Sequence, residues 1–81
     1  MNELITTETI QLLQYRIQQE ELSSRLYEQM SLYLNDKGYL QFAKLYKKYA
    51  EEELKHSQWS KDYILAFGVK PELQRLDSPE C

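Results

Sequence analysis

The sequence predicts an all-α chain that folds as an antiparallel hairpin of two long helices. Apolar residues recur every three to four positions over two long segments, and a short cluster of turn-forming residues separates these segments. With 81 residues, the chain forms one domain at most and buries little core of its own. We therefore expect a metal or a partner chain to complete the hairpin.

The first helix is predicted over residues 7–34. This segment contains neither glycine nor proline. Thr6 or Thr7 can cap its N-terminus, and Glu8 lies in the first turn, where the helix dipole favours an acidic side chain. Residues 35–38, with the sequence Asn-Asp-Lys-Gly, form the predicted turn.

The second helix is predicted over residues 39–67. Gly68 is a natural stop at its C-terminus, and Pro71 follows shortly afterwards. Residues 69–81 contain both prolines of the chain and show no clear period. We expect this tail to be irregular or extended.

Each predicted helix is amphipathic and should turn one stripe inward in a helix bundle. The stripes consist of Leu13, Ile17, Glu20, Ser24, Tyr27 and Leu34 on the first helix, and of Phe42, Tyr46, Tyr49, Glu53, His56, Ser60, Tyr63 and Phe67 on the second. The opposite faces are charged. There, Glu21 and Arg25 have the spacing of an ion pair within one helix, and Lys61 is expected to be solvated.

Three acidic or basic residues interrupt these stripes. Glu20 lies in the first stripe, and Glu53 and His56 lie one helical turn apart in the second. Glu20 and Glu53 are equally far along the chain from the centre of the turn, so a hairpin places them at one level, about 25 Å from the turn. Because an unpaired buried charge is costly, these side chains should be paired or should bind a metal.

This level is also the middle of both predicted helices. A second copy, turned end for end about a two-fold axis, brings its own Glu20, Glu53 and His56 to the same place. The pair then offers four glutamates and two histidines, the ligand set of di-iron carboxylate bundles. Carboxylates can bridge two ions, and imidazole is a suitable nitrogen donor. One alternative stays open, in which the cluster is hydrogen-bonded and only fixes the register of the bundle.

Composition argues against several other functions. The net charge of −3 gives no general basis for binding nucleic acid. The apolar runs are too short to span a membrane. The single cysteine, Cys81, is expected to be a free thiol, and one thiol without a secretion signal suits a reducing cytoplasm.

Two motifs and a loop carry a resemblance to a known family. Residues 20–30, with the sequence EELSSRLYEQM, look like the first helix of non-haem bacterial ferritins, and residues 50–56, AEEELKH, look like their second helix. Residues 67–79 resemble the start of the crossover loop that leads to a third ferritin helix. The resemblance covers about residues 9–79.

The resemblance implies roles for individual residues. Glu20 matches the first-helix glutamate that binds one iron, Glu53 the bridging glutamate, and His56 the histidine ligand. Tyr27 matches a tyrosine that hydrogen-bonds near the centre and can supply an electron, although by itself it is a packing aromatic. Glu52 matches a glutamate that serves a third iron site in some bacterial ferritins. Its place beside the stripe fits simple solvation equally well.

The function expected from this resemblance is iron oxidation and storage at a non-haem di-iron centre. The centre would form in a homodimer or a higher oligomer, with Fe(II) as substrate and dioxygen or peroxide as oxidant. Ferritins have four bundle helices and this sequence matches two, so a second copy would replace the other pair. Two alternatives are an adaptor subunit that completes a bundle with a ferritin-like partner without catalysis, and a cut ferritin that folds poorly.

Overall fold

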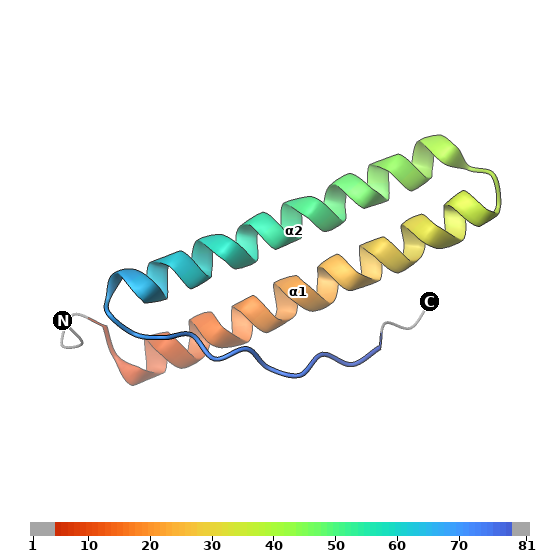
Figure 1. Cartoon of the computed structure of the whole chain (residues 1–81). Helices are drawn as coiled ribbons and strands as arrows, with labels where there is room; N and C mark the ends of the chain where they lie inside the picture. Colours follow the sequence, from red (N-terminus) through yellow and green to blue (C-terminus); the bar gives the residue numbers. More distant parts are fainter. Residues whose placement is uncertain (1–4, 79–81) are drawn as a thin grey trace.

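The computed structural model describes residues 5–78, and within that range it contains two helices and no strand. Helix α1 spans Thr7–Asp36 and helix α2 spans Leu40–Ala66. The two helices run antiparallel, side by side, over their whole length (Figure 1). The prediction of an all-α helical hairpin is therefore confirmed. Cys81 lies outside the described residues.

Local capping explains where α1 begins and ends. The hydroxyl oxygen of Thr6 accepts a hydrogen bond from the backbone N–H of Thr9 at 3.1 Å, which satisfies one of the free amides at the N-terminus. The helix was expected to end at Leu34, but it continues to Asp36. The reason is that the backbone N–H of Lys37 still bonds to a carbonyl one turn earlier, so the helical pattern continues into the predicted turn.

Two glycines with left-handed backbone conformations mark the ends of helices. Gly38 in the turn has a φ of 87°, and Gly68 after α2 has a φ of 78°. Only glycine adopts this region without steric cost, so both positions favour the chain reversal or the helix stop seen there. The bounds of α2 lie just inside the expected 39–67, because the residues at these two positions act as its caps.

The two helices touch along lines of buried residues that repeat every seven positions. A seven-residue repeat keeps one line of side chains facing a neighbouring helix. Most of these side chains are small, so the two backbones can approach closely. The lines consist of Ile17, Ser24 and Ser31 on α1 and of Ala43, Ala50, Ser57 and Ile64 on α2.

Serine hydroxyls connect the two helices inside this contact. The hydroxyl of Ser31 donates a hydrogen bond to the carbonyl of Ala43 at 2.6 Å, and that of Ser24 donates to the carbonyl of Ala50 at 2.8 Å. All four residues are buried, so these hydroxyls depend on the partner helix for hydrogen bonding. The two bonds fix how α1 and α2 are aligned lengthwise.

A third polar contact corrects two expectations for the charged faces. The carboxylate of Glu21 accepts hydrogen bonds from Lys61 Nζ at 2.6 Å and from Ser57 Oγ at 3.1 Å. The predicted pair of Glu21 with Arg25 is replaced by this contact, and Lys61 is not a freely solvated lysine. The spacing rules used on the sequence apply to pairs within one helix. They could not predict the contact of Glu21 with Lys61, because these two residues lie on different helices.

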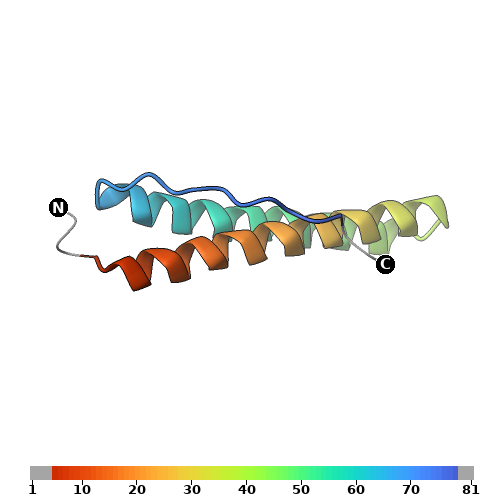
Figure 2. The same ribbon diagram turned by 90° about the horizontal axis from the view of Figure 1, so that it is seen from below.

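The segment after α2 lies back along the hairpin, with no regular secondary structure over residues 69–78 (Figure 2). Two glutamines of α1 hold its backbone. Gln14 Oε1 accepts a hydrogen bond from the N–H of Glu72 at 2.7 Å, and Gln18 Nε2 donates one to the carbonyl of Arg75 at 3.2 Å. By helical geometry, these glutamines lie on a different side of α1 from Glu20. Residues 69–78 therefore leave the side that carries Glu20 uncovered.

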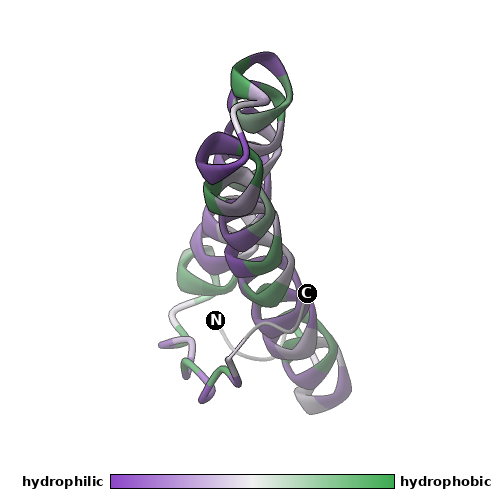
Figure 3. Ribbon diagram, turned by 90° about the vertical axis from the view of Figure 1, so that its right-hand side faces the viewer, coloured by the Kyte–Doolittle hydropathy of each residue, from purple (hydrophilic) through white to green (hydrophobic). Residues whose placement is uncertain are grey.

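The uncovered side is rich in large apolar residues. Phe42, Tyr49 and Tyr63, from the predicted inward stripe of α2, are all exposed. The described part of the chain measures 52 by 20 by 14 Å, so it is a single layer of two helices. Figure 3, a view along the helices, shows hydrophobic and hydrophilic residues on both of them. Neither helix in residues 5–78 has the length and apolar character needed to cross a lipid bilayer.

Candidate metal centre

Three polar side chains converge on the uncovered side of the hairpin. Glu20 comes from α1, and Glu53 and His56 come from consecutive turns of α2. One ligand atom from each residue lies within 4.8 Å of the others. We call these three residues the triad. Their meeting follows from the hairpin itself, because the two glutamates are equally far from the turn.

The distances within the triad leave room for a shared partner. His56 Nδ1 lies 3.6 Å from Glu53 Oε1 and 4.0 Å from Glu20 Oε2. Both distances exceed the usual length of a hydrogen bond to nitrogen. The imidazole and the carboxylates therefore face a common space without satisfying one another.

Burial decreases across the triad, from α1 outward. The exposed fraction of the side chain is 11% for Glu20, 24% for Glu53 and 58% for His56. Glu20 Oε1 is buried and accepts no hydrogen bond from any residue between 5 and 78. Buried carboxylate oxygens are normally paired, because losing water without a replacement is costly. Glu20 Oε1 is an exception to this rule, and a bound cation would be its missing partner.

Arg16 is a neighbour of the triad that the sequence reasoning overlooked. Its Nε lies 3.5 Å from Glu20 Oε2, and its side chain is 59% exposed. The two residues have the i,i+4 spacing of a helical ion pair, a signal that was available in the sequence. The guanidinium partly balances the charge of Glu20, and because Arg16 itself is exposed, solvent screens this interaction.

Tyr27 lies among other tyrosines, on the side of the triad nearer the turn. Its ring centroid is 6.0 Å from that of Tyr46 and 5.5 Å from that of Tyr49. In the described part of the chain, no hydrogen bond joins its hydroxyl to the triad. Glu52 is exposed on α2 next to Glu53, and it is not one of the three converging residues.

The donor set suits a divalent transition-metal ion. Carboxylate oxygens and imidazole nitrogen are ligands for iron, manganese and zinc, and two carboxylates neutralise the charge of one divalent cation. Three protein donors leave coordination positions open, as metal sites that act on substrates require. His56 is exposed on the uncovered side of the hairpin, so a solute can reach the site from there.

Comparisons with known proteins relate most of the chain to ferritins. The family model described as Ferritin-like domain matches residues 10–80. Over 62 residues, the chain is 36% identical to the bacterial non-heme ferritin of Bacteroides fragilis strain 638R, covering 76% of this chain and 39% of that protein. The strain YCH46 protein gives the same values.

A solved structure agrees with the sequence comparisons. The ferritin of Chlorobium tepidum superposes with a TM-score of 0.87 and 27% sequence identity, covering 93% of this chain and 46% of that one. The chain therefore spans less than half the length of these relatives.

Proposed function

The chain belongs to the Ferritin-like domain family, and from that premise we propose that it binds Fe(II) at Glu20, Glu53 and His56 and oxidises it. The observation that supports this most directly is the buried oxygen of Glu20 that has no partner. A hydrogen-bonded structural cluster would satisfy that oxygen from within the protein. A cation site leaves it free to bind the ion.

Each member of the triad has a distinct part in this proposal. Glu20 is a terminal ligand, held at the buried end of the site. Glu53 faces both Glu20 and the open side, so its two oxygens suit a bridge between two ions. His56 is a terminal nitrogen ligand. The anionic ligands stabilise the ferric product more than the ferrous substrate because its charge is higher, which favours oxidation.

The proposal includes a second copy of the chain. A two-fold axis at the level of the triad brings the ligands of two hairpins together, so that the pair offers four glutamates and two histidines for two ions. The exposed apolar side chains around the triad would be buried by the same contact. The homodimer, the di-iron centre, any larger storage assembly and a cytoplasmic location are all parts of the proposal.

The reaction balances with the substrates named. Two Fe(II) ions release two electrons, which reduce dioxygen and two protons to hydrogen peroxide, or hydrogen peroxide and two protons to water. Tyr27 is a candidate donor of a hydrogen bond or an electron from the same helix as Glu20, and Glu52 is a candidate ligand for a further iron. Both roles rest on the matching positions in ferritins.

An aerobic titration tests the proposal. Fe(II) is added to the metal-free chain, and ferric product is followed by near-ultraviolet absorbance while light scattering gives the mass of the assembly. We expect rapid oxidation that saturates near two iron per pair of chains. The variant Glu53→Gln should lower the rate about a hundredfold or more, because losing even a group that only supports a metal ligand costs roughly 10–100-fold.

The matched control is Glu51→Gln, which makes the same change of charge at an exposed position of the same helix. It should oxidise iron as the wild type does. Equal rates for wild type and Glu53→Gln would contradict the proposed centre. A folded wild-type dimer that binds no iron would also contradict it, and would favour the adaptor that completes a bundle with a ferritin-like partner.

A further inference from the structure

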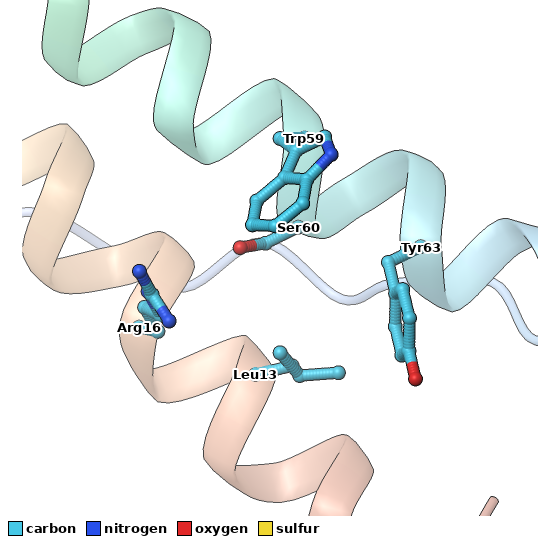
Figure 4. Close-up of a pocket in the computed structure, with 5 residues that line it drawn as sticks. All are labelled: Leu13, Arg16, Trp59, Ser60 and Tyr63. Atoms are coloured by element: carbon cyan, nitrogen blue, oxygen red, sulfur yellow. The ribbon is translucent and has the colours of Figure 1, made fainter.

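A pocket opens between the two helices beside the triad, on the side away from the turn (Figure 4). Its volume is about 160 Å³, and it is lined by Leu13, Arg16, Trp59, Ser60 and Tyr63. Apolar cavities of about 150 Å³ in proteins hold a benzene-sized ring. The pocket therefore has room for one aromatic side chain.

The lining favours an aromatic occupant that also has a polar end. Figure 4 shows the side chains of Leu13, Trp59 and Tyr63 around the pocket, with the guanidinium of Arg16 at its edge. A guanidinium is attracted to the face of an aromatic ring and can donate a hydrogen bond to a phenol oxygen. Trp59 is 70% exposed, which is unusual for so large a side chain and typical of an interaction surface.

Three tyrosines form a matching cluster on the other side of the triad. Tyr27 packs against Tyr46 and Tyr49, and the ring centroids of the last two are 5.7 Å apart. We call these residues the tyrosine cluster. Tyr27 comes from α1 and the other two from α2, so the cluster spans both helices, as the pocket does.

The pocket and the tyrosine cluster lie at equal heights on opposite sides of the triad. Along α1, Leu13 and Tyr27 are equally far from Glu20, at about 10 Å in either direction. Along α2, Ser60 and Tyr46 are equally far from Glu53. A two-fold axis through the triad, perpendicular to the helices, therefore sets the pocket of one copy opposite the tyrosine cluster of the other.

We propose that the pocket of each chain receives a ring from the tyrosine cluster of a second copy, and that this exchange locks the dimer in register at the metal centre. The inference rests on the proposed function, because it uses the same two-fold axis. The contact is isologous, so the two copies make it twice. Two anchors at equal distances from the triad hold both sets of ligands at one level.

The sole tryptophan gives this contact its own signal. In the metal-free wild-type chain, we expect dimers by sedimentation and a Trp59 emission that shifts to shorter wavelength as the concentration rises. Tyr46→Glu should raise the dimer dissociation constant at least about tenfold and return the emission to that of an exposed indole. Within one chain these residues are about 20 Å apart along α2, so the effect must come from the partner.

The control is Tyr33→Glu, which makes the same substitution at an exposed position of α1. It should leave both the dimer and the emission as in the wild type. Circular dichroism checks that each variant is helical, and Tyr46→Ala replaces Tyr46→Glu if the charged variant loses helix content.

Three outcomes would overturn the inference, and two of them spare the proposed function. If the wild-type chain dimerises and binds two iron per pair, but Trp59 does not respond to Tyr46→Glu, only the exchange of rings fails. The same holds if Tyr33→Glu has an equal effect. A wild-type chain that stays monomeric at all concentrations would overturn both the exchange and the symmetric metal centre.

Discussion

Glu20 carries a cost in the metal-free protein that a metal site would explain. Its Oε1 is buried without a hydrogen bond, while its other oxygen faces Arg16 and His56. A ligand held ready for a cation is expected to be under-satisfied when no cation is bound. In a structural cluster, by contrast, the members are expected to satisfy one another's hydrogen bonds.

We predict that Glu20→Met stabilises the metal-free chain by about 1 kcal/mol and abolishes metal binding. Methionine has a similar length and no polar atom to leave unpaired, and removing an unsatisfied buried group recovers roughly 1–3 kcal/mol. Denaturant unfolding measures the first effect, and calorimetric titration with Co(II) measures the second.

Glu28→Met is the control for this substitution, because Glu28 is exposed on the same helix. It should change stability by no more than about 0.5 kcal/mol and leave metal binding intact. If Glu20→Met instead destabilises the chain by 1 kcal/mol or more, the carboxylate holds the structure together, and the hydrogen-bonded cluster becomes the better explanation.

At the scale of single residues, the triad was predictable and its surroundings were not. Glu20, Glu53 and His56 could be placed together because a hairpin relates positions by their distance from the turn. The contact between Glu21 and Lys61 depends on how the two helices are rotated about their axes. Counting positions along the chain does not determine that rotation, so this pair was missed.

The contact between the helices depends on small side chains. Ala43 and Ala50 on α2 are buried, and their carbonyls accept hydrogen bonds from serines of α1. A larger side chain at either position would push the helices apart and lengthen those bonds. These hydrogen bonds measure 2.6 and 2.8 Å, so they hold only while the two helices stay close together.

We predict that Ala50→Leu destabilises the chain by about 1–3 kcal/mol, the usual cost of overpacking a close contact. Urea unfolding followed by circular dichroism measures it. Ala66→Leu adds the same volume at the exposed end of α2 and should change stability by no more than about 0.5 kcal/mol. A neutral Ala50→Leu would mean that the helices do not meet along this line.

At the scale of helices, their existence was predicted well and the line of contact was not. The aromatic stripe of α2 led to the expectation that its large residues face α1. Instead, the adjacent line of alanine, serine and Ile64 on α2 packs against α1. Small residues give a weak apolar signal, so the stripe of large side chains dominates any periodicity. That stripe marks the face left for further packing.

The two sides of the hairpin differ in what covers them. Residues 69–78 lie along one side of the hairpin (Figure 2). They leave open the side that carries the triad, the pocket and the tyrosine cluster. The path of this segment was beyond prediction, because it is fixed by Gln14 and Gln18 binding its backbone. Such contacts leave no period in the sequence.

We predict that the thermal stability of the chain depends on its own concentration and on metal. If the folded form is a dimer, dilution lowers the unfolding midpoint by mass action. Co(II) at a hundred times its dissociation constant should add about 2.7 kcal/mol per site, since it binds the folded state only. For a domain of this size, that corresponds to a rise of roughly 10 °C or more in the midpoint.

Glu53→Gln separates the two effects, because it removes a ligand and keeps the apolar face. Its midpoint should still rise with protein concentration and should no longer rise with Co(II). A wild-type midpoint that responds to Co(II) but not to protein concentration would show that one hairpin holds the ion alone. The open coordination positions of the triad would then face solvent, and the symmetric centre would be wrong even though the triad binds metal.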